Sequence, residues 1–146
     1  PVWVAKACAK MQGQFTSGAN AFGQKAAADA LMSDMSSTKT MNEAFRKRRD
    51  LVIRLLKGID GFKVNNPEGA FYVFPDISAL YGKQFEGKSI NNSAEFCEFI
   101  LHKVHVAIVA GSAFGADECV RIAYSASEDQ LTEAIRRIKK AVDSLV

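Results

Sequence analysis

The chain has 146 residues, of which 48% are hydrophobic and 24% charged, so it can bury the core of one domain with at most a small appendage. Its formal net charge of +3 is too small to indicate a polyanionic partner. No apolar run approaches the roughly 18 residues that span a bilayer. The first ten residues alternate lysine with apolar residues, unlike a signal peptide.

The cysteines and histidines do not form a set of metal ligands. Cys8, Cys97 and Cys119 are odd in number and far apart, without a CxxC pair. His102 and His105 have no third ligand at a suitable spacing. We therefore predict no metal site, and reduced thiols of the kind found in cytoplasmic proteins.

The first 35 residues predict two alanine-rich helices, over 2–12 and 23–35, separated by the polar, glycine-containing segment 13–23. A long amphipathic helix is then predicted from Thr40, which fits a capping box with Glu43.

Gly58 or Gly61 is expected to end this third helix. Its stretch "FRKRRD" could suggest nucleic-acid binding. However, consecutive charges on a helix point in different directions, and no aromatic residues lie between them as stacking platforms. The stretch is therefore predicted to be a solvated face, without a nucleic-acid partner.

Four later segments are predicted to be short strands, and turn residues separate them. In chain order they are 61–64, 70–78, 104–109 and 119–125. The second strand is expected to end near Pro75. The segment 81–91 reads as a loop, and Gly111 to Gly115 as a turn.

Two more helices are predicted by their N-terminal caps. Asn92 with Glu95, and Ser127 with Gln130, each fit a capping box. Their apolar positions follow helical spacing, at Phe96, Phe99, Ile100 and Val104 in the first and at Leu131, Ile135, Ile138, Val142 and Leu145 in the second. The fold class is therefore α/β, with an α+β-like arrangement in which helices cover a small mixed or antiparallel sheet.

Arg121 is unusual because it lies in an apolar strand, "CVRIAYS", with no acid near it in sequence. Residues two apart share a strand face, so Arg121 shares its face with small residues and leaves room for a ligand. A guanidinium can donate two parallel hydrogen bonds to a carboxylate. The spacing alone equally allows an arginine at a strand edge that reaches solvent or a structural acid.

Three segments, taken together, resemble one family. They are "QFTSGANAFGQKAAADAL" (14–31), "NNPEGAFYVFPDIS" (65–78) and "VAIVAGSAFGADECVRIAYS" (106–125). In this order they are similar to the C-terminal third of class I pyridoxal-phosphate aminotransferases of the aspartate aminotransferase type. The resemblance covers essentially the whole chain, and the bacterial aspartate or aspartate/prephenate branch looks nearest.

The resemblance implies a domain organisation and a function. Residues 1–37 resemble the helical end of the large cofactor-binding domain, and 38–146 the small domain of the fold-type-I enzymes. The parent would transfer an amino group between an amino acid, with aspartate expected, and a 2-oxo acid through pyridoxal phosphate. It would be a homodimer in the cytoplasm.

The resemblance also assigns roles to residues. Arg121 would hold the α-carboxylate of the substrate, and Phe71 would lie near the substrate, although it could be an ordinary core aromatic. Thr16 and Ser17 match a segment that reaches the partner subunit's cofactor phosphate, or form a plain loop. The family usually has proline where this chain has Ala110, and a further glycine is replaced in "ADEC".

The lysine that forms the Schiff base would lie before residue 1, so no catalytic residue is expected in this chain. Lys39 in "SSTKT" superficially resembles the family's Ser-x-Ser-Lys run, but it follows the "TSGAN" segment instead of preceding it. The chain starts at Pro1, and we expect a piece that neither binds pyridoxal phosphate nor transaminates.

Two alternatives stay open. The same fold serves pyridoxal-phosphate enzymes with lyase-type chemistry, because the cofactor carries the difficult step. The chain could also be a free-standing α/β interaction module, in which case its first 35 residues should form part of its own core.

Overall fold

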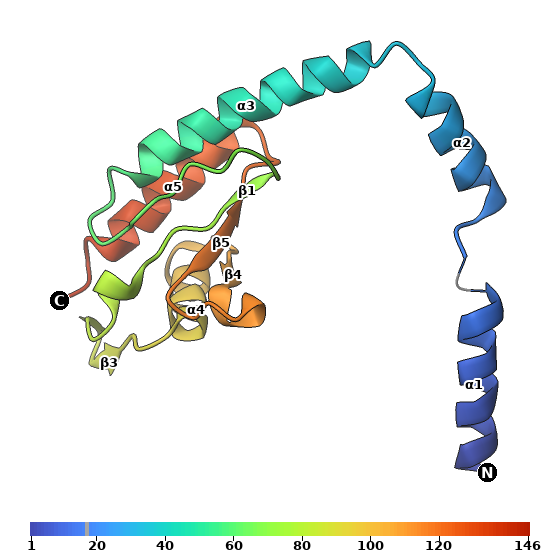
Figure 1. Cartoon of the computed structure of the whole chain (residues 1–146). Coiled ribbons are helices and arrows are strands. Elements are labelled where there is room, and N and C mark those ends of the chain that lie inside the picture. The colour runs from blue at the N-terminus through green and yellow to red at the C-terminus, as the bar shows by residue number, and fades with distance from the viewer. Residues whose placement is uncertain (17) are drawn as a thin grey trace. The chain divides into compact units, whose positions relative to one another are not determined.

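The computed structural model describes residues 1–16 and 18–146, and its contacts divide the chain into two units (Figure 1). The units are Pro1–Thr40 and Met41–Val146. The domain boundary predicted from the sequence lies after residue 37. The assignment of either part to a domain of the parent enzyme stays a prediction.

The first unit consists of α1 (Val2–Thr16), α2 (Ala21–Leu31) and the first turn of α3 (Ser36–Leu56). Both predicted helices are present, although α1 extends four residues into the segment predicted as a link. No residue of α1 or α2 is buried.

The start of α3 differs from the prediction. The helix begins at Ser36, and Thr40 lies inside it, where its hydroxyl donates to the Ser36 carbonyl at 3.2 Å. The predicted capping box of Thr40 and Glu43 is therefore wrong. The first residue of the helix is instead bound by Asp34, whose carboxylate accepts from the Ser36 amide at 3.1 Å and from the Ser36 hydroxyl at 2.9 Å. These hydrogen bonds lower the pKa of Asp34.

The second unit is built on a three-stranded antiparallel sheet. Its strands, in spatial order, are β1 (Tyr72–Val73), β5 (Val120–Ala123) and β4 (Val109–Ala110). The strands are shorter than predicted. The segment 61–64 forms only an isolated bridge, between Lys63 and Asp76.

The segment 81–91, predicted as a loop, contains a second small sheet. It is the hairpin of β2 (Gln84–Phe85) and β3 (Lys88–Ser89). The two residues of its turn, Glu86 and Gly87, have φ of 50° and 78°, which is the left-handed backbone that two-residue hairpin turns require.

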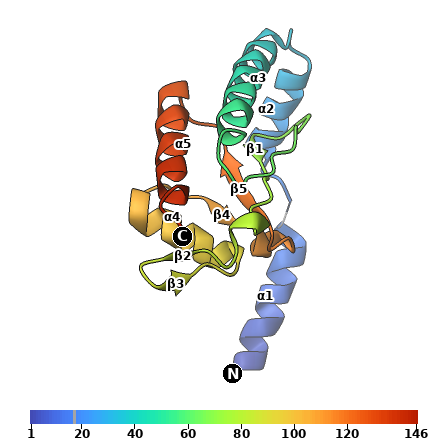
Figure 2. The ribbon, with the colours of Figure 1, turned by 90° about the vertical axis from the view of Figure 1, so that its left-hand side faces the viewer.

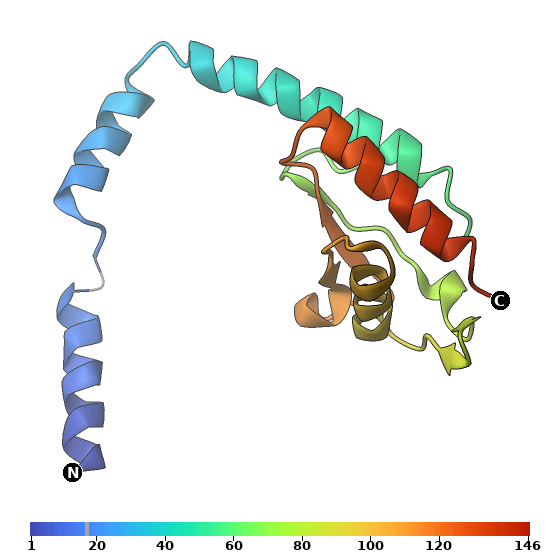
Figure 3. The ribbon, with the colours of Figure 1, turned by 180° about the vertical axis from the view of Figure 1, so that it is seen from behind.

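Helices α3, α4 (Ser93–Val104) and α5 (Glu128–Val142) contribute buried residues to one core with the sheet. α3 and α5 run alongside each other (Figures 1 and 3), and α4 lies next to α5 (Figure 2). The predicted apolar positions of the last helix are all buried, which confirms its spacing; they are Leu131, Ile135, Ile138, Val142 and Leu145.

Both later caps are found. The Asn92 side chain accepts from the Glu95 amide at 2.9 Å, while the Glu95 carboxylate accepts from the amide of Asn91. Ser127 and Gln130 form the complete capping box of α5. α4 continues to Val104, so the predicted strand 104–109 is reduced to its last residue in β4. Across the described residues, no helix combines the length and apolar character needed to cross a membrane.

Candidate functional site

Arg121 lies on the central strand, β5, on the face of the sheet opposite the core. Its neighbours Val120 and Ile122 point into the core, at 0% and 6% exposure, and Tyr124 is buried as well. The predicted division of the strand into two faces is therefore confirmed. Arg121 itself is half-buried and pairs across the strands with Val109.

Two aromatic rings flank the Arg121 guanidinium. Its Cζ atom is 5.5 Å from the centre of the Tyr72 ring and 5.0 Å from that of Phe114. The Phe114 ring also meets Phe74 edge-on at 5.9 Å. Within the described residues, no acidic side chain forms an ion pair with Arg121. The guanidinium is thus held by cation–π contacts, with its hydrogen-bond donors available to a ligand.

Phe71 packs edge-on against Tyr72, the residue whose ring contacts Arg121, and the centres of the Phe71 and Tyr72 rings are 5.9 Å apart. Its side chain is 55% exposed, so it is not an ordinary core aromatic. Tyr124 binds the backbone at Ala70 and Phe71. The Tyr124 hydroxyl donates to the Ala70 carbonyl at 2.9 Å, and the Tyr124 amide donates to the Phe71 carbonyl at 2.8 Å. Arg49 of α3 donates to the Pro67 carbonyl at 3.2 Å. The role of Phe71 beside a substrate stays a prediction.

The loop that joins β4 to β5 carries Phe114. It starts in a 3-10 turn, η2 (Gly111–Phe114). The Gly111 amide donates to the Cys119 carbonyl at 2.9 Å, and its carbonyl accepts from the Ala116 amide at 3.1 Å. A Cβ atom at Gly111 would lie only 2.1 Å and 2.2 Å from the Ala116 and Cys119 carbonyl oxygens, so a side chain does not fit here. Ala110 has φ of −63°, the value that proline would impose, and the loop keeps this geometry without the family's proline.

Tyr81 also supports this loop. Its hydroxyl donates to the backbone carbonyl of Asp117. Burial, together with the nearby Asp117 carboxylate, raises the pKa of Tyr81 to about 12. The phenol therefore remains protonated at neutral pH and keeps its donor role.

Thr16 and Ser17 are predicted to reach the partner subunit's cofactor phosphate, and this role stays a prediction. Thr16 is part of α1, where its hydroxyl donates to the Gln12 carbonyl at 2.8 Å and accepts from the Gln12 side chain at 3.1 Å. Ser17 lies outside the described residues. Lys39 is an exposed residue of α3. No group of three or more metal-ligating side chains is found among the described residues.

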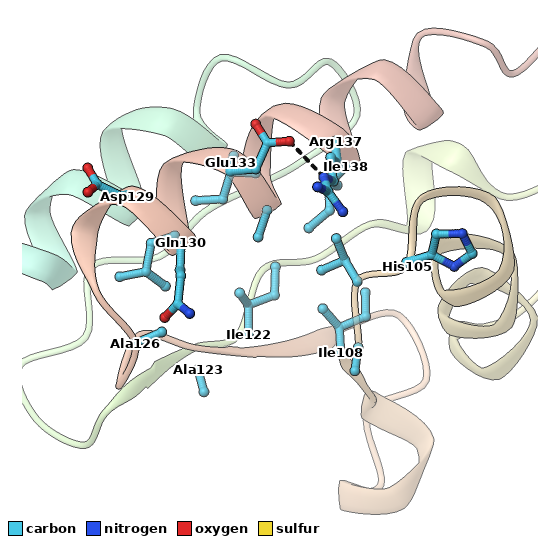
Figure 4. A pocket seen from close by; sticks show the side chains of 15 residues that line it. His105, Ile108, Ile122, Ala123, Ala126, Asp129, Gln130, Glu133, Arg137 and Ile138 are labelled. Carbon is cyan, nitrogen blue, oxygen red and sulfur yellow. Dashed lines mark hydrogen bonds and ion pairs between the residues drawn. The ribbon is translucent and has the colours of Figure 1, made fainter.

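A pocket of about 640 Å³ lies between α5, β5 and the segment 105–108 (Figure 4), and Arg121 is not among the residues that line it. Its lining is mainly apolar and includes Ile108 and Ile122. On α5, Glu133 accepts from Arg136 and from Arg137 at 2.7 Å, and these bonds lower its pKa to about 2. The lining also includes the polar residues His105, Asp129 and Gln130. We place the candidate site at Arg121, because two aromatic rings flank its guanidinium and no described acid pairs with it.

Sequence reasoning did not identify Tyr72 and Phe114 as partners of Arg121. Tyr72 faces Ala123 across the strands, so it shares the face of Arg121. Phe114 is an aromatic residue in a glycine-containing turn, where burial in the core does not explain its presence. A large aromatic side chain in such a turn is the sequence signal that could have identified Phe114.

Comparisons with known proteins identify the family. Residues 2–138 match the family "Aminotransferase class I and II". The chain is 47% identical over 140 residues to the bifunctional aspartate aminotransferase and glutamate/aspartate-prephenate aminotransferase of Petunia hybrida, covering 93% of this chain and 29% of that protein. It is 43% identical over 141 residues to the aspartate aminotransferase of Rhizobium meliloti strain 1021, covering 96% and 34%.

Solved structures give the same result. The chain superposes on the aspartate aminotransferase from Rhizobium meliloti with a TM-score of 0.85 and 41% identity, covering all of this chain and 37% of that one. For the aromatic aminotransferase from Pyrococcus horikoshii the TM-score is 0.76 at 33% identity, covering 98% and 37%. This chain thus spans about a third of the length of the curated relatives it matches. It belongs to the class I and II aminotransferases.

Proposed function

We propose that the intact protein is a pyridoxal-phosphate-dependent aminotransferase of the aspartate type and that this chain is its C-terminal part. Relatives named as aspartate or aspartate/prephenate aminotransferases, at 37% to 47% identity, support the activity. The substrates would be an amino acid, with aspartate favoured, and a 2-oxo acid. A cytoplasmic homodimer is the expected form of the intact enzyme.

Within that enzyme, Arg121 would bind the α-carboxylate that every amino-acid and 2-oxo-acid substrate carries. The single observation that supports this role is a guanidinium held between Tyr72 and Phe114 without an acidic partner in the described chain. A planar fork of donors fits a carboxylate through two parallel hydrogen bonds. The exposed ring of Phe71, one ring away, would form an apolar wall beside the substrate.

The amino-transfer chemistry would come from residues outside this chain. Pyridoxal phosphate, when bound, supplies the electron sink for that chemistry. The 146-residue chain would contribute by binding the α-carboxylate of the substrate and so orienting the substrate. A lyase-type enzyme of the same fold would use Arg121 in the same way. The interaction-module alternative would instead require the first 35 residues to form part of the chain's own core.

The test compares the 146-residue chain with the intact protein. We expect the intact protein to transfer the amino group of aspartate to 2-oxoglutarate. The 146-residue chain should show neither turnover nor the absorbance of bound pyridoxal phosphate. Saturable cofactor binding with turnover by the short chain would contradict the proposal, and so would release of ammonia or carbon dioxide by the intact protein in place of amino transfer.

A further inference from the structure

Ser93, the first residue of α4, is a buried polar residue that joins this helix to the loop before β5. It is 0% exposed. Its hydroxyl donates to the Asp117 carboxylate at 2.7 Å and accepts from the Ser112 amide at 3.1 Å. The hydroxyl therefore acts both as a donor and as an acceptor, which lowers the desolvation penalty of a buried polar group.

Asp117 completes the connection. Its carboxylate also accepts from the backbone amide of Ser93 at 3.1 Å. The first amides of a helix have no acceptor within the helix, and the helix dipole favours a negative charge at this end. A residue 24 positions later in the chain thus caps α4. The two arms of the loop, at Ser112 and Asp117, are both tied to one serine.

The segment between these two ties carries Phe114 (the orange turn beside α4 in Figure 1). Phe114 follows Ser112 by two residues and precedes Asp117 by three. Its ring lies 5.0 Å from the Arg121 guanidinium and 5.9 Å from Phe74. A shift of this segment would carry the ring away from Arg121, and the guanidinium would then be flanked by Tyr72 alone.

We propose that Ser93 is a positioning residue for substrate binding: by tying Ser112 and Asp117 to α4, it keeps Phe114 on Arg121 and so orients the guanidinium for the carboxylate. This inference rests on the proposed function of Arg121. Ser93 itself does not touch the substrate. If Ser93 only stabilised the fold, its loss would lower the melting temperature and leave Arg121 unchanged.

The first arm of the test is NMR on the 146-residue chain, which needs neither cofactor nor activity. The variants are Ser93→Ala, Asp117→Ala, Asp117→Asn and the control Ser89→Ala, at an exposed position of β3. Aromatic rings shift the resonance of the Arg121 Hε proton. We expect Ser93→Ala and Asp117→Ala to move this resonance toward the free-arginine value. Asp117→Asn keeps an acceptor oxygen, so its Arg121 Hε resonance should stay close to that of the unmodified chain. Ser89→Ala should leave this resonance unchanged.

The second arm measures kinetics of the same variants in the intact enzyme. A carboxylate anchor binds the substrate and the transition state alike, so its misplacement raises KM more than it lowers kcat. We expect KM for the amino donor to rise about 10-fold to 100-fold in Ser93→Ala, as expected for a displacement on the order of 1 Å. The Asp117→Asn variant should stay within about threefold of the unmodified enzyme.

The two arms separate this inference from the proposed function. An unshifted Arg121 resonance in folded Ser93→Ala and Asp117→Ala chains overturns the positioning role, whatever the enzyme does. If the resonance shifts but KM stays the same in Ser93→Ala, the positioning role for substrate is also overturned. If Arg121→Ala leaves KM unchanged, the proposed function of Arg121 fails, while the NMR arm still decides whether Ser93 orients its side chain.

Discussion

Replacing Arg121 by alanine in the intact enzyme is expected to lower kcat/KM for amino acids by about 30-fold to several thousand-fold. Truncating one partner of a hydrogen-bonded charge pair costs about 2–5 kcal/mol, and each 1.36 kcal/mol is a factor of ten. Arg121→Lys should give an intermediate loss, because an ammonium keeps the charge but cannot present the planar fork. Steady-state kinetics with the amino donor measures both effects.

The fold should survive this change. Arg121 is half-buried, and its contacts with Tyr72 and Phe114 are worth about 1 kcal/mol each at most at such a site. The melting temperature of Arg121→Ala should therefore stay within a few degrees of the original. Arg54→Ala, at an exposed position of α3, is the matched control and should keep full activity. Equal losses in Arg54→Ala and Arg121→Ala would show that the effect is not specific to the proposed anchor.

The second large effect is expected for Gly111→Ala, which should destabilise the second unit by about 3 kcal/mol, or roughly 10–20 °C in melting temperature. The new Cβ atom would lie about 2 Å from two backbone carbonyl oxygens, and backbone atoms cannot move aside as a flexible side chain can. The loop would have to open, and the ring of Phe114 would leave Arg121. Activity of the intact enzyme should fall as well.

Unfolding of the 146-residue chain can be followed by tyrosine fluorescence or near-ultraviolet circular dichroism. All three tyrosines, Tyr72, Tyr81 and Tyr124, belong to the second unit, whereas the only tryptophan, Trp3, belongs to the first. Gly69→Ala is the matched control, because nothing lies within 4 Å of its Cβ position, and it should change stability by less than about 0.5 kcal/mol. A Gly111→Ala chain as stable as the Gly69→Ala chain would refute the close-packed loop.

Features with a strict local period were predicted well. The helical spacing that ends at Leu145 and the two-residue alternation around Arg121 each depend on contacts that repeat along one element, so the sequence contains them directly. The cap at Ser127 is also local, since both of its hydrogen bonds join residues three apart. For the same reason, the face of β5 that carries Arg121 could be named without a structure.

Other features could not be predicted from the sequence, either because several local signals compete or because the hydrogen-bond partners are distant in the chain. Asp34 and Thr40 both have polar side chains suited to a helix start, and the earlier one is used. The turn at Glu86 and Gly87 needed two left-handed residues, of which only the glycine is an obvious candidate. The ties of Ser93 to Ser112 and Asp117, 19 and 24 residues away, leave no periodic trace in the sequence.

The most direct test is a crystal structure of the intact enzyme with a non-reacting amino-acid analogue bound. The account predicts that two guanidinium nitrogens of Arg121 lie about 2.7–2.9 Å from the two α-carboxylate oxygens, with the Tyr72 and Phe114 rings still against the guanidinium. An α-carboxylate held by a different side chain, with Arg121 paired to a protein acid or turned into bulk solvent, would contradict it.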